Sequence, residues 1–400
     1  MEQIKEKSME PKTPYYVIHR EEIDVNFKKL ENALKKYWNN YIIGYSYKTN
    51  ALPWIIKHFD SLGCFAETVS EDEYNLAKLI GVQNGRIIYN GPIKSKETFI
   101  DAVKNGCIVN IDSQREISWL SDLSLGLDRK AIGIRVNFDI EKMCPGQSQC
   151  ADEGGRFGFC YENGEFSKVV KELKNKNIRI CGIHLHTSSK TRGIDIYRSI
   201  AEMACKIQTD FELNLDYVDI GGGFFGGLPS KPQYEEYIEQ ITSRLSKCFD
   251  ANKTKLIVEP GMAVIGGYVS YVSTVIDVKD TTYNRFVVTD GTRTSIDPLM
   301  TKSAYFVNYE SINRNDTIAK QVICGYTCME HDRLFVAKDE PELCVGDRII
   351  YNKVGAYTMC LTPLFIKYFP AVYVEEEGQL RIVREPWTAK EYVMKSELGD

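Results

Sequence analysis

This chain has no long apolar run and little net charge. No uninterrupted apolar stretch approaches the roughly 20 residues needed to span a bilayer. The segment from Met1 to Lys12 is charged and lacks the apolar core of an export signal. A net charge of −5 over 400 residues gives no reason to expect nucleic acid or an anionic membrane as a partner. These absences predict a cytoplasmic protein with neither a membrane nor a nucleic-acid partner.

Cysteine is frequent but follows no metal-binding pattern. The twelve cysteines are scattered, and without an export signal we expect free thiols, most of them buried. Cys144, Cys150 and Cys160 cluster in sequence, but their spacing fits no zinc motif and no histidine lies near them. We therefore expect no metal in this protein.

A regular alternation of two kinds of segment runs through the first two thirds of the chain. Short apolar runs rich in β-branched residues alternate with amphipathic stretches, and Ser70 is placed to cap the helix expected at 71–80. Eight strand–helix repeats favour a closed α/β (β/α)8 TIM barrel over an open sheet, and we place it at residues 23–263. The expected strands are 41–48, 64–69, 86–91, 107–112, 131–137, 179–187, 217–223 and 255–261.

The pattern changes after about residue 264. The later segments read as strands with almost no helix between them, and a further strand at 15–19 precedes the first barrel helix. We expect an all-β domain, a sandwich or small barrel, formed by 264–400 together with 1–22. Its expected strands are 268–278, 285–290, 321–327, 348–351 and 371–374.

Lys48 closes the first expected barrel strand. A lone lysine there is usually a solvated surface residue. In a parallel barrel, however, the strand C-termini face one pocket, so Lys48 would converge with His186, the glycine triplet 221–223 and Glu259. These groups together suit one cofactor, pyridoxal phosphate.

The glycine triplet and Glu259 each have a second interpretation. Backbone N–H groups of Gly221, Gly222 and Gly223 could approach a phosphate without Cβ obstruction, or the triplet could be a flexible turn. Glu259 could pair with a protonated pyridine nitrogen, or it could form a structural salt bridge. Their positions after the seventh and eighth strands favour the cofactor.

His184 and His186 are two residues apart on the sixth expected strand, so their side chains point the same way. Such a pair could bind metal, and a single histidine could be a hydrogen-bonded core residue. We prefer His184 as a core residue and His186 as a ring lying flat against a planar cofactor.

A short segment of the β region could also carry chemistry. Its sequence, Cys-Gly-Tyr-Thr-Cys-Met-Glu-His-Asp at 324–332, could suggest zinc or a redox pair, but no second ligand cluster follows with suitable spacing. Cys328 as a nucleophile or proton donor, with Asp332 nearby, is the more attractive interpretation. Tyr357 is either structural or a phosphate ligand.

Taken in order, these motifs resemble the fold-type III pyridoxal-phosphate-dependent decarboxylases, which act on diaminopimelate, ornithine, arginine and carboxynorspermidine. The similarity runs from about residue 14 to 374. Its pieces are the lysine motif at 45–50, the acidic motif at 67–73, Arg-Phe-Gly at 156–158, the histidine segment at 184–189, Asp-Ile-Gly-Gly-Gly at 219–223, Glu-Pro-Gly at 259–261, the CxxxD motif at 328–332 and Gly-Ala-Tyr at 355–357.

The resemblance implies an alanine-racemase-like barrel, pyridoxal 5'-phosphate as cofactor, and a homodimer in which each active site receives the CxxxD segment of the partner subunit. It also implies a role for each matching residue. The catalytic residues would be Lys48, Cys328 and His186; the cofactor would be held by Lys48, His186, Ser189, Gly221, Gly222, Gly223, Glu259, Gly261 and Tyr357; the substrate would meet Asp332, Glu330, Arg293 and Tyr357.

Three departures from the family pattern bear on the substrate. Met329 stands where relatives carry an acid, Met262 where an arginine follows Glu-Pro-Gly, and Asp297 where diaminopimelate enzymes have an arginine. We therefore expect an α-decarboxylase whose substrate differs from diaminopimelate at its distal end. Two alternatives share the fold: an amino-acid racemase and a non-catalytic regulatory homologue.

Overall fold

The computed structural model describes residues 11–123, 131–310 and 316–397. The chain divides into two compact units, residues 25–264 and residues 1–24 with 265–400. The boundaries expected from the sequence, 22/23 and 263/264, lie within two residues of these. Each unit is described separately below.

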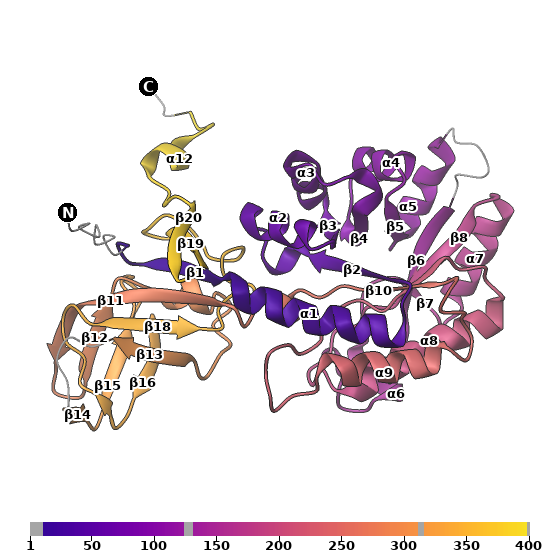
Figure 1. Cartoon of the computed structure of the whole chain (residues 1–400). Coiled ribbons are helices and arrows are strands. Elements are labelled where there is room, and N and C mark those ends of the chain that lie inside the picture. The colour runs from indigo at the N-terminus through magenta and orange to yellow at the C-terminus, as the bar shows by residue number, and fades with distance from the viewer. Residues whose placement is uncertain (1–10, 124–130, 311–315, 398–400) are drawn as a thin grey trace, which may run out of the picture. The chain divides into compact units, whose positions relative to one another are not determined.

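The larger unit is a closed barrel of parallel strands (Figure 1). Each strand pairs in parallel with the next, and the pairing of β5 with β6 and of β10 with β2 closes the ring. This confirms the predicted fold. The barrel strands are β2 (Tyr41–Ser46), β3 (Phe65–Ser70), β4 (Ile87–Ile93), β5 (Ile108–Ile111), β6 (Ala131–Asn137), β8 (Arg179–His184), β9 (Tyr217–Asp219) and β10 (Lys255–Val258); the short β7 (Phe159–Cys160) pairs with β6.

Helices connect successive strands because a parallel crossover must return the chain to the same end of the sheet. The helix expected at 71–80 is confirmed, and the Ser70 hydroxyl accepts from the Glu73 N–H as its N-cap. The longer helix α8 runs from Ile194 to Phe211. The helices are α1 (Arg20–Tyr37), α2 (Pro53–Ser61), α3 (Glu71–Ile80), α4 (Lys96–Lys104), α5 (Gln114–Trp119), α6 (Ile140–Met143), α7 (Glu165–Asn175), α8 (Ile194–Phe211), α9 (Tyr234–Leu245) and α10 (Met262–Ile265).

Several strands end earlier than their apolar runs predicted. Strands β8, β9 and β10 stop at His184, Asp219 and Val258, so His186, the glycine triplet and Glu259 lie in the loops just beyond. Positive backbone φ angles at Gly221 and Gly223 explain the early end of β9, because strand conformation requires negative φ. The correction places these groups on loops at the C-terminal ends of the strands.

The barrel interior is apolar towards the N-terminal ends of its strands. Ile42, Ile88, Tyr217 and Ile257 come from four different strands and pack into one buried cluster. Leu256, Ile257 and Val258 on β10 are fully buried, as a parallel strand covered on both faces should be. The packed interior supports the polar groups that lie beyond it.

The smaller unit is built mainly from antiparallel strands. Strand β1 (Tyr15–His19) pairs antiparallel with β11 and parallel with β19, which confirms that the N-terminal strand joins this unit. The other elements are β11 (Val269–Asp280), β12 (Arg285–Thr289), β13 (Phe306–Glu310), β14 (Thr317–Ile318), β15 (Gln321–Cys324), β16 (Arg333–Ala337), β17 (Glu340–Pro341), β18 (Arg348–Asn352), β19 (Ala371–Glu376), β20 (Gln379–Arg384), α11 (Arg293–Ile296) and α12 (Ala389–Val393). Within the described ranges, no helix has both the length and the apolar character needed to cross a membrane.

Candidate active site

Lys48 lies just beyond the end of β2, in the short 3-10 turn η1 (Tyr47–Thr49). Its side chain is 36% exposed, and its Nζ lies 2.9 Å from Oε2 of Glu67 on β3, a side chain that is only 1% exposed. Ser46, the last residue of β2, donates from Oγ to the same oxygen at 2.6 Å. A buried carboxylate thus holds the lysine amine at the C-terminal end of the strands.

A chain of side-chain amides crosses the barrel beneath Lys48. Asn90 on β4 donates from Nδ2 to Oε1 of Glu67 at 3.1 Å and to Oε1 of Glu259 at 2.5 Å. Asn110 on β5 donates to Oδ1 of Asn90 at 2.8 Å, and the Tyr217 hydroxyl donates to Oδ1 of Asn110 at 2.7 Å. Each buried amide is oriented by its neighbour, so the two carboxylates are held in one network.

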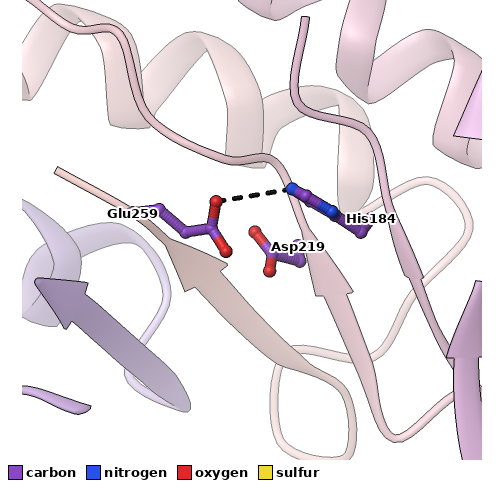
Figure 2. Close-up of side chains that lie close together, drawn as sticks. All are labelled: His184, Asp219 and Glu259. Atoms are coloured by element: carbon purple, nitrogen blue, oxygen red, sulfur yellow. Dashed lines mark ion pairs between the residues drawn. The ribbon is translucent and has the colours of Figure 1, made fainter. Parts of the chain in front are cut away.

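Three buried side chains meet at the ends of β8, β9 and β10 (Figure 2). Nε2 of His184 lies 3.4 Å from Oε2 of Glu259. Asp219 lies beside both, and one ligand atom from each of the three lies within 4.8 Å of the other two. The N–H of Gly221 donates to Oδ1 of Asp219 at 2.9 Å, which ties the trio to the glycine loop.

Two carboxyl groups this close in a buried site cannot both be ionised at low cost. Burial raises the pKa of Asp219 well above its usual range, and the neighbouring Glu259 charge raises it further. Burial also opposes ionisation of Glu259, but the charge and hydrogen bond of His184 and the hydrogen bond of Asp219 outweigh it and lower the Glu259 pKa. We therefore place one proton on Asp219 and leave Glu259 ionised.

The same trio also has the composition of a metal site. One imidazole and two carboxylates are ligands that a divalent transition metal accepts. A shared proton accounts for the geometry without a metal. Oδ2 of Asp219 has no hydrogen-bond donor among the described residues, and a proton on this carboxyl group would face the neighbouring Glu259 carboxylate. The sequence-based expectation of no metal is tested by the experiment described below.

His186 lies in the loop after β8, between the glycine loop and two cations. The Gly222 N–H donates to Nδ1 of His186 at 3.3 Å, which requires an unprotonated Nδ1. Burial lowers the pKa of His186 to about 3, and the positive charges of Lys48 and Arg135 act in the same direction. The ring is therefore neutral near pH 7, and a neutral planar ring is suited to lie against another ring.

Arg135 on β6 is a functional candidate that the sequence did not single out. Its Nη1 donates to Oδ2 of Asp112 at 3.1 Å, and its Nη2 donates to the His186 carbonyl at 3.4 Å. Its guanidinium lies 4.6 Å from the ring centre of Phe157. The Arg-Phe-Gly motif at 156–158 therefore packs against a buried ion pair that fixes the backbone of the histidine loop.

The glycine loop needs its glycines for two reasons. Gly221 and Gly223 have φ angles of +71° and +93°, which side-chain-bearing residues rarely adopt. A Cβ on Gly222 would lie 2.0 Å from the Glu259 carbonyl oxygen. The loops after β9 and β10 therefore approach each other backbone to backbone, and side chains are excluded between them.

Two more of the residues implied as cofactor ligands have contacts nearby. Oγ of Ser189 accepts from the backbone N–H groups of Thr191 and Arg192 at 3.2 and 2.9 Å, so it orders the turn before α8. A Cβ on Gly261 would lie 2.0 Å from Oγ1 of Thr49, so this glycine packs against the turn that carries Lys48. Their roles toward a cofactor stay predictions.

The remaining predicted site residues lie in the smaller unit. Asp332 is 2% exposed and accepts from Oγ1 of Thr292, the Arg293 N–H and both the N–H and hydroxyl of Thr327. The side chain of Glu330 is 98% exposed and pairs with Arg333 at 3.4 Å.

Arg293, Cys328 and Tyr357 also lie in the smaller unit. Arg293 pairs with Asp297 at 3.1 Å, Cys328 is exposed, and Tyr357 is half-buried. The substrate roles of these residues stay predictions.

Several polar residues of the barrel were missed as site candidates from the sequence. Asn90, Asn110, Asp112, Arg135 and Asp219 are all buried and lie near the C-terminal ends of their strands. A polar side chain in or directly after a parallel apolar strand is a usable signal, because such strands are covered on both faces.

Residues 20–266 match the family model described as the pyridoxal binding domain of pyridoxal-dependent decarboxylases. A diaminopimelate decarboxylase from Aquifex aeolicus is 27% identical over 383 residues, covering 93% of this chain and 89% of the relative. An ornithine decarboxylase from Caenorhabditis elegans is 25% identical over 363 residues, covering 85% of this chain and 83% of the relative.

Solved structures share the fold. The crystal structure of the diaminopimelate decarboxylase from Methanocaldococcus jannaschii matches with a TM-score of 0.82 at 23% identity, covering 97% of this chain and 92% of that one. A diaminopimelate decarboxylase from Helicobacter pylori in complex with L-lysine matches with a TM-score of 0.80 at 22% identity, covering 96% of each chain.

Replacing Asp219 by asparagine tests where the proton lies. An asparagine amide can accept from the Gly221 N–H and donate towards Glu259, as a protonated Asp219 does. We expect Asp219→Asn to change the free energy of unfolding by less than about 1 kcal/mol, and Asp219→Leu to lower it by about 2–3 kcal/mol because polar partners lose their contacts. Urea unfolding followed by circular dichroism measures both.

Elemental analysis of native protein and of Asp219→Asn tests whether the trio of His184, Asp219 and Glu259 holds a proton or a metal ion. Native protein holding one divalent ion per chain, lost in Asp219→Asn, would assign the trio to metal binding and overturn the proton assignment.

Proposed function

Because this chain belongs to the pyridoxal-dependent decarboxylases and is therefore an amino-acid decarboxylase, we propose that Lys48 holds pyridoxal phosphate at the C-terminal end of the barrel and that the enzyme removes the α-carboxylate of its substrate. The observation that carries the proposal is the pairing of Nζ of Lys48 with the buried Glu67 at 2.9 Å. A lysine held at this end of a parallel barrel faces the pocket where such enzymes react.

The residues around Lys48 fit this cofactor. Glu259 stays ionised and suits a protonated ring nitrogen, while the neutral His186 suits a ring face. In the glycine loop, the N–H groups of Gly221 and Gly222 already donate to Asp219 and His186, so the Gly223 N–H is the donor of the triplet proposed for a phosphate. Glu259, His186 and the glycine loop therefore each match one part of pyridoxal phosphate: the ring nitrogen, the ring face and the phosphate.

When bound, pyridoxal phosphate accepts the electron pair released as the bond between Cα and the carboxylate breaks. The protein's part is to hold charge and protons. Glu67 and Ser46 fix Nζ of Lys48, and Oε2 of Glu67 is placed to take a proton from that amine. Asn90 couples Glu67 to Glu259, so the two carboxylates keep their positions while protons move.

We propose that protonation at Cα involves the smaller unit of a second subunit. The family resemblance places the CxxxD segment of the partner at each active site. Cys328 is exposed in the single chain, as a residue that acts across a dimer interface would be. Asp332 accepts hydrogen bonds from Thr327 in its own loop and from Thr292 and Arg293 at the start of α11, so it is suited to hold the Cys328 segment in position.

Two features of the smaller unit support a substrate other than diaminopimelate. The distal half of diaminopimelate carries an ammonium and a carboxylate. Met329 offers no charge to the ammonium, and Arg293 is already neutralised by Asp297 at 3.1 Å. Lysine, ornithine or arginine stay candidates through Glu330, whose carboxylate is exposed. An uncharged or acylated distal end fits Met329.

The first test concerns the cofactor. Purified protein should absorb near about 420 nm, and borohydride should remove the band, as for a lysine-bound pyridoxal cofactor. Lys48→Ala should lose the band and release no CO₂ from any amino acid in a panel that includes D and N-acylated forms. Lys57→Ala, on the exposed face of α2, is the matched control and should keep both. Peptide mapping that places the reduced cofactor on another lysine contradicts the assignment.

Assembly is tested with mixed subunits. Neither Lys48→Ala nor Cys328→Ala alone should have appreciable activity. If one subunit supplies Lys48 and its partner supplies Cys328, mixing the two should restore up to about a quarter of the native sites, the fraction expected from random exchange in a C2 dimer. Activity that stays absent after demonstrated subunit exchange would place both groups in one chain.

Steady-state kinetics on meso-diaminopimelate test the substrate assignment. An apolar Met329 leaves the distal ammonium unpaired, which costs several kcal/mol when that charge is buried. We expect poor turnover, and Met329→Glu should improve it. A native kcat/KM above about 10⁴ M⁻¹s⁻¹, inside the usual enzyme range, would falsify the claim.

A further inference from the structure

The turn between β8 and α8 holds an arginine in a fixed and unusual conformation. Arg192 has a φ of +51°, a region that residues with side chains seldom occupy. Its N–H donates to Oγ of Ser189 at 2.9 Å, and its carbonyl accepts from the Tyr237 hydroxyl at 2.6 Å. Backbone strain of this kind persists only where surrounding contacts impose it. The position of the Arg192 side chain is therefore built into the loop.

The Arg192 guanidinium lies between the loops that follow β9 and β10. Its Nη1 is 2.8 Å from Sδ of Met262, the residue after Glu-Pro-Gly. Its Cζ is 5.2 Å from the ring centre of Phe225, two residues after the glycine triplet. The Tyr197 hydroxyl, on the same side, donates to the Gly222 carbonyl at 3.2 Å. A positive charge thus stands beside Phe225, in the loop that carries the glycine triplet.

This guanidinium has no anion of its own. Across the ranges that the structure describes, its side chain makes no ion pair with a carboxylate, and the contact to the thioether of Met262 uses one of its five donors. A thioether is a weak acceptor, so the other donors of Arg192 are open to solvent or to a ligand. Nearby Arg198, by contrast, pairs with Asp195 at 2.7 Å. A half-buried guanidinium whose donors are open is suited to bind a doubly charged anion through two parallel hydrogen bonds.

We propose that Arg192 supplies the cation for the phosphate of the cofactor, in place of the side chain that Met262 lacks. The inference rests on the proposed function. Met262 carries no charge, but its side chain contacts the positively charged Arg192 from another loop. One guanidinium therefore lies against Met262 and against Phe225, two residues after the glycine triplet, and it extends from the turn before α8 rather than from the loop after β10. The ligand chemistry is a phosphate monoester dianion attached to an apolar ring.

The test compares two ligands that differ only in the phosphate. Apoprotein is titrated with pyridoxal phosphate and with pyridoxal, and binding is followed by protein fluorescence. Arg192→Gln should weaken the binding of pyridoxal phosphate about 10- to 100-fold, the loss expected for charge-assisted hydrogen bonds. The affinity for pyridoxal should change by less than about twofold. Arg192→Lys, which keeps the charge but not the fork, should fall between. Arg198→Gln is the matched control and should alter neither affinity.

The second variant moves the positive charge from one side of the site to the other. Adding Met262→Arg to Arg192→Gln returns a guanidinium to the same space from the other loop, and pyridoxal phosphate affinity should recover to within about tenfold of native. Equal affinities of native protein and Arg192→Gln for pyridoxal phosphate, with unchanged thermal unfolding of the apoprotein, overturn the inference. Equal weakening of both ligands overturns it too. Native protein that binds neither ligand refutes the proposed function itself.

Discussion

The amide of Asn90 donates to two buried carboxylates at once, Glu67 at 3.1 Å and Glu259 at 2.5 Å. One carboxylate holds the amine of Lys48, and the other lies against His184 and Asp219. Without this bridge two negative side chains would face each other inside a barrel, where the cost of unpaired charge is high. The positions of both carboxylates, Glu67 beside Lys48 and Glu259 beside His184, therefore depend on one neutral side chain.

Two cations at this end of the barrel form ion pairs with carboxylates. Lys48 pairs with Glu67, and Arg135 pairs with Asp112 at 3.1 Å. Glu259 is stabilised instead by His184, by Asn90 and by the proton on Asp219. Such a carboxylate is poised to accept a ligand that carries a protonated nitrogen, while the glycine loop and Arg192 suit the opposite charge. The site thus has an anionic end at Glu259 and a cationic end at Arg192. These ends are complementary to the protonated ring nitrogen and the anionic phosphate of a pyridine phosphate.

The smaller unit uses its charges mainly to organise loops. Both oxygens of Asp332 are filled by donors from Thr292, Arg293 and Thr327, and Asp297 occupies the guanidinium of Arg293. These contacts order the segment that carries Cys328 and Met329. Asp332 and Arg293 are therefore already paired here, and the exposed Glu330 pairs with Arg333 at 3.4 Å.

The sequence by itself determined the order of elements and the type of chemistry. Apolar runs with intervening amphipathic stretches predict the (β/α)8 barrel, and the glycines and the lysine at strand ends predict the cofactor, because both follow from local pattern and covalent type. Only the tertiary structure decided which polar residues meet. Asn90 and Glu259 are far apart in the chain, and their contact depends on how strands β4 and β10 are arranged around the barrel. The same is true of Arg192 and Met262, whose contact joins the turn before α8 to the start of α10. Side-chain pairing between distant strands is set by closure of the barrel, and local pattern carries no information about it.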